Sequence, residues 1–412
     1  MQGRGNAGSL KELRGLIRMR ILTFTSLFPN KAQATLGIFI YQRTAHLARR
    51  PGMHVEVVAP VPYSPSWLPG ERWRTFSQVP REEQIGGLRV HHPSYLLLPK
   101  ISMPLHGRLM YTGSLGLVRK LHQQEPFDCI DAHYVYPDGN AAVQLGRVLG
   151  IPVVVSARGT DINLFASFRL IRPKIRWTLS EAAGVVAVSA ALKNSMVALG
   201  TPSEKIRVIP NGIDTGRFWP IERRAAREKL GLPAEGPCVV AVGNLLSIKG
   251  QELLIAALAK LTPQHPALKL YLVGDGPQRA ALEEQARALG LGDRVVLAGA
   301  RPHDELPLWF NAAELSCLAS RREGLPNVVL ESLACGTPVV ATHVGGIPEV
   351  LSSPDLGMLV EPDAASIAAA MEAALSRAWD RDLLARHVQS RTWEGVAEEV
   401  EQFLTECCMR RR

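Results

Sequence analysis

Short runs of apolar, β-branched residues recur along the chain and alternate with stretches that show helical spacing. Runs that are apolar throughout predict parallel strands buried on both faces, and their alternation with helices predicts doubly wound sheets. We expect strands at residues 21–24, 55–59, 127–132, 153–157, 184–188 and 207–210, and again at 238–242, 269–273, 294–298, 315–319, 338–341 and 358–360. Two such sets predict an α/β fold in which two Rossmann-like domains face each other across a cleft.

The length of 412 residues exceeds what one hydrophobic core usually supports. The turn sequence Pro210-Asn211-Gly212 predicts an N-terminal domain over 19–210 and a C-terminal domain over 211–392. Residues 1–18 are rich in Gly and Arg, and we expect them to form a loose N-terminal extension. A final helix at 393–408 carries apolar residues at helical spacing, and we expect it to pack back on the first domain.

Residues 61–108 interrupt the alternation, because seven prolines fall in this stretch. The proline density predicts a long excursion above the first sheet without regular helix. The excursion also carries large apolar and basic side chains, namely Trp67, Trp73, Leu96, Leu97, Leu98, Arg72 and Arg74. That mixture suits a surface that meets both apolar and charged groups.

Charge is divided unevenly between the halves. Residues 1–210 hold 26 Lys and Arg against 12 Asp and Glu, whereas residues 211–412 hold 21 against 26, within an overall charge of +9. The basic first half predicts an anionic partner, and we expect an anionic membrane surface. The alternative is a solvated basic face with no partner. Basic and aromatic residues follow no nucleic-acid-binding module, so we expect no nucleic acid partner.

The sequence also indicates the compartment. No uncharged apolar stretch of about 18 residues is present, and Arg18 and Arg20 interrupt the apolar run near Ile21, which argues against a spanning helix and a cleavable signal. The six cysteines are scattered without a Cys-x-x-Cys pair, which indicates reduced thiols. We expect a cytoplasmic protein, peripheral on the inner face of the cell membrane if the basic domain docks there.

The most specific motif is the stretch from Arg322 to Glu331, with the sequence Arg-Glu-Gly-Leu-Pro-Asn-Val-Val-Leu-Glu. It follows a predicted strand, so it falls at the carboxyl end of the sheet, where open α/β folds bind ligands. Gly324 permits close backbone approach, and a helix that starts at Pro326 would offer its free amides to a phosphate. Glu323 and Glu331 could bracket one bound molecule and accept hydrogen bonds from its hydroxyls. The alternative is a capped helix with two solvated acids.

Three more glycine turns follow strands at the same edge. The turn Gly243–Gly250 contains Lys249, which could pair with a diphosphate, although taken alone it is better explained as a surface lysine. Gly274-Asp275-Gly276-Pro277 lacks the full Gly-x-Gly-x-x-Gly pattern, so NAD binding is not indicated. Gly345-Gly346-Ile347-Pro348-Glu349 is the third. Together these turns predict a nucleotide-binding edge.

These motifs in this order resemble the retaining glycosyltransferases of family 4, the glycosyltransferase group 1 proteins. Pro210-Asn211-Gly212-Ile213-Asp214 also matches an interdomain signature of that family. The resemblance implies a GT-B fold with a nucleotide-sugar donor on the C-terminal domain. It implies that Glu331 holds the ribose, that Glu323 faces the donor sugar and that Lys249 contacts the diphosphate. The further donor-binding residues on this domain would be Asn244, Gly324, Leu325, Pro326, Asn327 and Val328.

The resemblance also assigns residues on the first domain. His133 ends a strand where family members place a histidine beside the reacting sugar, although a lone histidine is more often structural. Arg158 stands where a histidine is frequent, and with Asp161 it would lie on the acceptor side. Gly37 occupies the position of a glycine loop near the donor phosphates. The stretches Ser26–Pro29 and Gly37–Phe39 look most like members that build exopolysaccharide or teichuronic-type polymers.

We therefore expect a retaining transferase that moves a hexose-type sugar from a nucleoside-diphosphate sugar to a hydroxyl of a growing cell-surface or lipid-linked glycan. The catalytic residues would be His133, Glu323 and Lys249, with no cofactor beyond the donor substrate. No Asp-x-Asp motif flanks the turns, so no metal is expected. The alternatives are a GT-B nucleotide-sugar epimerase or hydrolase, and a silent nucleotide-sugar-binding scaffold.

Overall fold

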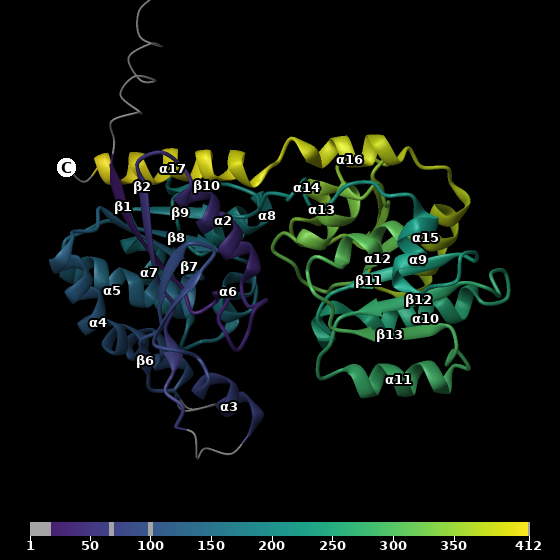
Figure 1. Cartoon of the computed structure of the whole chain (residues 1–412), viewed down its shortest axis with the longest axis horizontal. Helices are drawn as coiled ribbons and strands as arrows, with labels where there is room; N and C mark the ends of the chain where they lie inside the picture. The colour runs from purple at the N-terminus through teal and green to yellow at the C-terminus, as the bar shows by residue number, and fades with distance from the viewer. Residues whose placement is uncertain (1–17, 66–69, 98–101, 411–412) are drawn as a thin grey trace, which may run out of the picture. The chain divides into compact units, whose positions relative to one another are not determined.

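The computed structural model describes residues 18–65, 70–97 and 102–410. The chain forms two compact units (Figure 1). The first comprises the chain up to Val188, Leu192–Pro210 and Trp393 onward, and the second comprises Ser189–Ala191 and Asn211–Thr392. The N-terminal extension expected at residues 1–18 lies outside the described residues except for Arg18, and so do Trp67 and Leu98 of the excursion.

The first unit is built on one twisted sheet with the strand order β10-β9-β8-β7-β1-β2-β5-β4. All its neighbouring strands are parallel except β4 and β5, which pair antiparallel. Its strands are β1 (Met19–Phe24), β2 (Met53–Val58), β4 (Glu82–Ile85), β5 (Leu88–His91), β7 (Cys129–His133), β8 (Val153–Ala157), β9 (Gly184–Ala187) and β10 (Ile206–Val208). The strand order reverses between β1 and β7, which makes the loops after these two strands the ligand-binding position of a doubly wound sheet.

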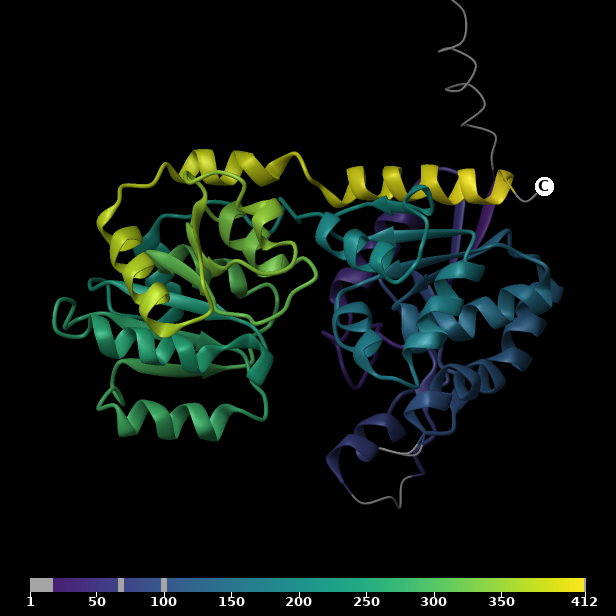
Figure 2. The same ribbon diagram turned by 180° about the vertical axis from the view of Figure 1, so that it is seen from behind.

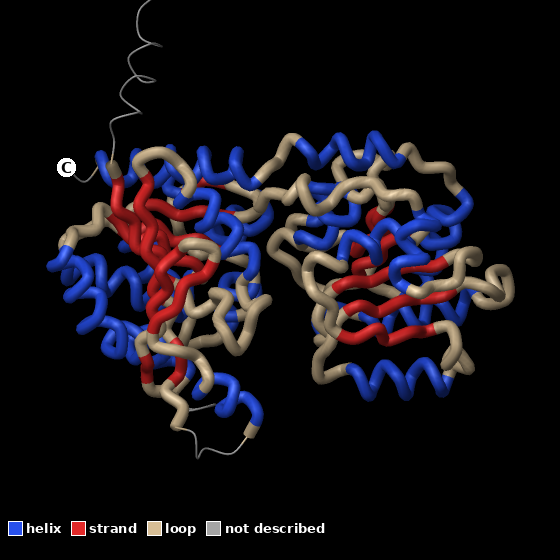
Figure 3. The backbone as a smooth tube through the Cα atoms, in the orientation of Figure 1, coloured by secondary structure: helices blue, strands red, loops and turns tan. Residues whose placement is uncertain are grey.

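Helices cover both faces of this sheet (Figures 2 and 3). They are α2 (Ile38–Ala48), α3 (Glu71–Ser77), α4 (His106–Gln124), α5 (Asn140–Leu149), α6 (Thr160–Asn163), α7 (Arg172–Glu181), most of α8 (Ala190–Ala198) and α17 (Trp393–Met409), with short turns η1 (Met103–Leu105), η2 (Val135–Gly139), η3 (Phe165–Ser167) and η4 (Ser203–Lys205). Val154 of β8 packs in the core that includes α17, whereas its neighbours Val153 and Val155 face glycines next to and within α5. Successive strand residues point to opposite faces, so α17 and α5 cover opposite faces.

The sequence prediction for residues 61–108 was wrong in two respects. The excursion contains a helix, α3, and it contributes the hairpin β4–β5, which joins the main sheet by parallel pairing of β5 with β2. The short ribbon of β3 (Val61–Pro62) and β6 (Ser94–Tyr95) forms a separate two-stranded sheet. The prolines lie outside α3 and outside the β4–β5 hairpin, so their number did not exclude regular structure between them.

The second unit has a fully parallel sheet in the order β13-β12-β11-β14-β15-β16. Its strands are β11 (Cys238–Val242), β12 (Lys269–Val273), β13 (Val295–Gly299), β14 (Leu315–Leu318), β15 (Val339–Thr342) and β16 (Gly357–Val360). Its helices are α9 (Arg223–Leu230), α10 (Gln251–Leu261), α11 (Arg279–Ala288), α12 (Leu306–Ala312), α13 (Asn327–Ala334), α14 (Ile347–Val350), α15 (Ala364–Ser376) and α16 (Arg381–Gln389), with the turn η5 (Ser247–Lys249). The order reverses between β11 and β14, as in a Rossmann sheet.

These observations confirm the predicted fold class, with a doubly wound α/β sheet in each unit. Every predicted strand is present, with ends that differ by about two residues. Within the described ranges, the helices are all too short or too polar to cross a lipid bilayer.

Candidate active site

The predicted residues of the second unit gather at the carboxyl edge of its sheet. Lys249 follows β11 and Glu323 follows β14, the two strands between which the sheet order reverses. Lys249 Nζ donates to Glu323 Oε1 at 2.6 Å, and Ser320 Oγ donates to the same oxygen at 2.6 Å. The pair is partly buried, with side-chain exposures of 26% for Lys249 and 10% for Glu323. A cation and a carboxylate are therefore held at fixed positions where this fold binds ligands.

Two glycines after β15 let a neighbouring loop support this carboxylate. A Cβ atom on Gly345 would lie 2.2 Å from the carbonyl oxygen of Glu323, and Gly345 has a φ of +56°, so a side chain there is excluded. The amide of Gly346 donates to the carbonyl of Gly324 at 2.9 Å. Gly324 and Leu325 are themselves buried. The Gly-Gly sequence thus supports the backbone that carries Glu323.

The loop after β11 also carries Asn244, whose side chain is exposed. The Asn244 carbonyl accepts a hydrogen bond from Gln251 Nε2 at 3.0 Å. The next amide, that of Leu245, donates to the carbonyl of Asp275 at 2.9 Å, so the turns after β11 and β12 support each other. A contact between Asn244 and a donor stays a prediction.

The first turn of α13 opens at the same edge. The helix begins at Asn327, one residue later than the sequence predicted, and Pro326 is its N-cap. Within the described residues no side chain caps this end, so first-turn amides such as those of Asn327 and Val328 can donate to an anion. The Asn327 side chain is fixed by a hydrogen bond from Asn211 Nδ2 to its Oδ1 at 2.9 Å.

Glu331 lies on the same face of α13 as Asn327 and is almost fully buried. His303 Nε2 lies 2.9 Å from Glu331 Oε1, and Arg217 Nη1 donates to His303 Nδ1 at 2.8 Å. The second oxygen, Glu331 Oε2, is buried and has no hydrogen-bond partner among the described residues. A buried carboxylate oxygen without a partner costs free energy, which makes it a place for a ligand hydroxyl.

Sequence reasoning did not identify His303 or Arg217. The available signal was Pro302-His303, which follows β13 at the ligand-binding edge, but a single histidine there carries no pattern. Arg217 follows the turn at Pro210, far along the chain from Glu331, and only the folded unit brings the three together.

The first unit has its own cluster at the corresponding position of its sheet. Arg43 Nη2 donates to both oxygens of Asp131 at 3.0 and 3.1 Å, and Arg43 Nη1 donates to Ser156 Oγ at 2.8 Å. His133 Nε2 lies 3.3 Å from Asp131 Oδ2, without the alignment of a hydrogen bond. Arg158 Nη2 contacts His133 Nδ1. The predicted residues His133 and Arg158 therefore share one buried network with two residues that the sequence did not single out, Arg43 and Asp131.

Burial sets the protonation states in this network. Burial lowers the pKa of His133 to about 3, with the charge of Arg158 adding to the effect and that of Asp131 opposing it, so the imidazole is neutral near pH 7. Burial alone would raise the pKa of Asp131, but the charges of Arg43 and its neighbours outweigh it and hold that pKa at about 2. His133 has no exposed surface, so a direct contact with an acceptor sugar stays a prediction.

Asp161 and Gly37 shape the loops around this cluster. Asp161 is fully buried, and its carboxylate accepts from the amides of Val135 and Gly159 at 2.8 Å each and from that of Arg158 at 3.1 Å. It joins the loop after β7 to the loop after β8, and a contact between Asp161 and an acceptor stays a prediction. Gly37 has a φ of +62°, and a Cβ atom there would lie 2.1 Å from the carbonyl oxygen of Leu27.

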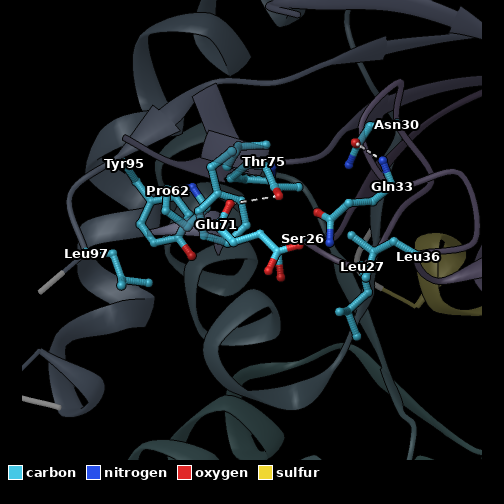
Figure 4. A pocket seen from close by; sticks show the side chains of 13 residues that line it. Ser26, Leu27, Asn30, Gln33, Leu36, Pro62, Glu71, Thr75, Tyr95 and Leu97 are labelled. Carbon is cyan, nitrogen blue, oxygen red and sulfur yellow. Dashed lines mark hydrogen bonds between the residues drawn. The ribbon is translucent and has the colours of Figure 1, made fainter. Parts of the chain in front are cut away.

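A cavity of about 550 Å³ opens beside the same switch point in the first unit (Figure 4). Ser26 and Leu27 come from the loop after β1, Glu71 and Thr75 from α3, and Tyr95 from β6. The remaining lining residues are Asn30, Gln33, Leu36, Pro60, Val61, Pro62, Phe76 and Leu97. Hydroxyl, amide and carboxylate groups alternate with apolar walls, a lining suited to the polar edges and apolar faces of a sugar.

Within the described ranges, no group of three or more His, Cys, Asp or Glu side chains is arranged as metal ligands. The expectation of no metal stays a prediction. The fixed positive charge at the second site comes from Lys249 and from the amides of α13.

Two doubly wound units, each with polar residues at its switch point, define the GT-B fold class. Comparison with known proteins agrees. Residues 36–217 match the description "Glycosyltransferase Family 4" and residues 222–405 match "Glycosyl transferases group 1". The chain belongs to this family of glycosyltransferases.

Two curated relatives and two solved structures illustrate the likeness. The putative teichuronic acid biosynthesis glycosyltransferase TuaC of Bacillus subtilis is 28% identical over 84% of this chain and 86% of its own. The D-inositol 3-phosphate glycosyltransferase of Thermobispora bispora is 30% identical over 72% and 74%. Sucrose-phosphate synthase of Thermosynechococcus elongatus has a TM-score of 0.79 at 24% identity, covering 94% of this chain and 99% of that one. Anabaena HepE in complex with UDP-glucose has a TM-score of 0.66 at 22% identity, covering 94% and 98%.

Proposed function

We propose that this protein is a retaining glycosyltransferase that moves a hexose-type sugar from a nucleoside-diphosphate sugar to a hydroxyl of a growing cell-surface glycan or exopolysaccharide. The observation that carries the proposal is the state of the Glu331 carboxylate. One of its oxygens forms a hydrogen bond with His303, and the other is buried without a hydrogen-bond partner among the described residues. A ribose hydroxyl would satisfy that oxygen. The UDP-glucose complex of HepE supports a nucleotide-sugar donor, and the name of TuaC supports a surface polymer.

The second unit supplies the leaving-group chemistry in this proposal. The bond between the sugar C1 and the diphosphate oxygen breaks, and its electron pair stays on the diphosphate. Lys249 and the amides of Asn327 and Val328 stabilise the charge that grows there. Glu323 accepts a sugar hydroxyl. Retention follows if the acceptor hydroxyl attacks C1 from the face that the diphosphate leaves and gives its proton to the departing diphosphate.

The first unit binds the acceptor in this proposal. The cavity beside Ser26 and Glu71 offers hydrogen-bonding groups for hydroxyls and apolar walls for sugar faces. The buried Arg43–Asp131 pair, with His133 and Arg158, fixes the loops at the ends of β7 and β8 next to it. Gly37 lets the turn before α2 close over the loop after β1.

Two other functions use the same residues. An epimerase or hydrolase would act on the donor without an acceptor, and the cavity in the first unit favours transfer over both. A silent scaffold would bind the donor without turnover, and the partly buried Lys249–Glu323 pair argues against it, because binding alone does not require a cation and a carboxylate fixed together at this edge.

A panel of UDP-, GDP- and ADP-sugars tests the proposal. Each is incubated with the protein, alone and with oligosaccharide acceptors, and products are analysed by mass. Transfer of one hexose from one donor supports the transferase. Epimerised or free sugar formed at the same rate without acceptor supports the epimerase or hydrolase, and tight binding without turnover supports the scaffold.

We also propose that the first unit docks on an anionic membrane surface, in keeping with its basic composition. Tyr63 and Leu96, at the ends of the β3–β6 ribbon, are 55% and 64% exposed, and Leu105 is 52% exposed. Arg74 and Arg108 are exposed in the same stretch of chain. Exposed apolar side chains among cations suit the interface of an anionic bilayer.

Co-sedimentation with vesicles measures this docking. Binding is expected to require phosphatidylglycerol, to fall with salt and to weaken at least about tenfold when Arg74 and Arg108 are both changed to Ser, at about 1 kcal/mol per charge. Leu289→Ser, at an exposed apolar residue of the second unit, is the control and should bind like wild type. Equal recovery with neutral phosphatidylcholine vesicles would contradict the proposal.

A further inference from the structure

We propose that Arg217 and His303 are positioning residues that fix the Glu331 carboxylate for the hydroxyls of the donor nucleotide's ribose. The inference rests on the proposed function, since it specifies how the nucleotide would be held. The inference adds Arg217 and His303 to the candidate site, and neither residue belongs to a sequence motif. It also gives the segment after Pro210 a role in positioning the site of the second unit.

The hydrogen bonds define the order of the relay. Arg217 can only donate, so His303 Nδ1 accepts from it at 2.8 Å and carries no proton. The neutral imidazole then carries its proton on Nε2, which donates to Glu331 Oε1 at 2.9 Å. The Arg217 guanidinium thus selects the tautomer of His303, and that tautomer fixes the position of Glu331 Oε1 by a hydrogen bond.

Packing holds the relay in place. The Phe218 ring meets the His303 ring edge to face, with centroids 5.3 Å apart, and Phe218 packs in turn near Phe310 of α12. The guanidinium of Arg217 lies 3.7 Å from Asp214, one turn earlier in the chain. The imidazole is therefore fixed by a ring on one side and by hydrogen bonds at both nitrogens.

The consequence lies in the other oxygen. With Oε1 occupied by His303, the carboxylate plane is set, and Oε2 is buried without a partner among the described residues. Asn327 lies one turn before Glu331 on the same helix face and is held by Asn211, from the same segment of chain as Arg217. The segment Asn211–Arg217 therefore braces α13 at two points, and the relay leaves Oε2 for a hydroxyl.

The test compares nucleotides that differ only in the ribose. Calorimetry measures the affinity of UDP and GDP and of their 2′,3′-dideoxy forms for wild type, His303→Leu, His303→Gln and Arg217→Leu. Glutamine can place an N–H near the position of Nε2, so His303→Gln is the conservative rescue. His387→Gln, at an exposed histidine on α16 of the same unit, is the control.

Wild type and the control should prefer the ribose form of the bound nucleotide by about tenfold or more, the usual size of a lost hydrogen bond to a charged group. His303→Leu and Arg217→Leu should bring that preference to within about twofold, and His303→Gln should keep most of it. Such coupling between a residue and a ligand group is what a double-mutant cycle detects.

If His303→Leu weakens both forms equally, so that their ratio is unchanged, His303 is structural and the relay is wrong. If wild type binds UDP or GDP but does not distinguish the dideoxy form, the assignment of Glu331 to the ribose fails, and the relay fails with it. If wild type binds neither UDP nor GDP while a UDP- or GDP-sugar is still turned over, the relay fails and the transferase stands.

Discussion

Replacing Lys249 with alanine should lower kcat at least about a hundredfold while changing the affinity for the donor much less. The diphosphate gains negative charge as the glycosidic bond breaks, so a fixed cation beside it stabilises the transition state more than the ground state. In the structure Lys249 is held 2.6 Å from Glu323, and that ion pair fixes the cation at the carboxyl edge of the sheet. Steady-state kinetics with the donor found in the nucleotide-sugar panel measures the effect.

Lys260→Ala is the matched control, because Lys260 is an exposed lysine on α10 of the same unit. It should have wild-type kcat and KM. If Lys249→Ala raises KM and leaves kcat unchanged, Lys249 binds donor and transition state equally, and its role as stabiliser of the leaving group is wrong.

Changing Asp131 to asparagine should destabilise the first unit by about 3–5 kcal/mol, because it leaves the buried Arg43 guanidinium without its counter-charge. Asparagine has the same size as aspartate and keeps one acceptor oxygen. The loss of stability therefore measures the effect of removing the charge and not that of creating a cavity. Hydrogen exchange of the β7 and β8 backbone amides measures the stability of the first unit separately from that of the second. Glu406→Gln, at a half-exposed ion pair with Arg207, is the control and should cost at most about 1 kcal/mol.

The same network predicts a pH dependence. The pKa of Asp131 is held at about 2, below its ordinary value, so its stabilising contribution is complete above about pH 4 and is lost as pH falls toward 2. The difference between wild type and Asp131→Asn should therefore shrink over that interval. Burial lowers the pKa of His133 to about 3, so protonation favours the unfolded chain, and both proteins should lose stability as pH falls below about 6.5. A difference that persists unchanged at pH 2 would contradict the ion-pair account.

The fold class was predictable because parallel strands buried on both faces read as continuous apolar runs, such as those at β8 and β11. The sequence did not predict the hairpin β4–β5, because it lacks such a continuous apolar run. It lies at the sheet edge, and the burial of β4 alternates between exposed and partly buried residues, so no apolar run marks it.

The residues of the candidate site also divide into those that local sequence patterns predict and those that only the folded structure reveals. Lys249 and Glu323 follow strands at one sheet edge, and Glu331 lies on the helix that begins there, which local pattern reveals. His303, Arg217, Arg43 and Asp131 act through side-chain contacts between residues far apart in the chain. The structural role of Asp161 was not predictable for the same reason, since only the folded loops show that its carboxylate accepts hydrogen bonds from backbone amides.

The central claim is transfer of a sugar with retention, and the anomeric configuration of the product tests it most directly. With an α-linked donor such as UDP-glucose, or the corresponding donor that the panel identifies, NMR of the purified product should show a new α-glycosidic linkage to the acceptor from the first turnover. A β-linked product would show inversion. Release of free sugar with no new linkage, in the presence of acceptor, would show that the protein is no transferase.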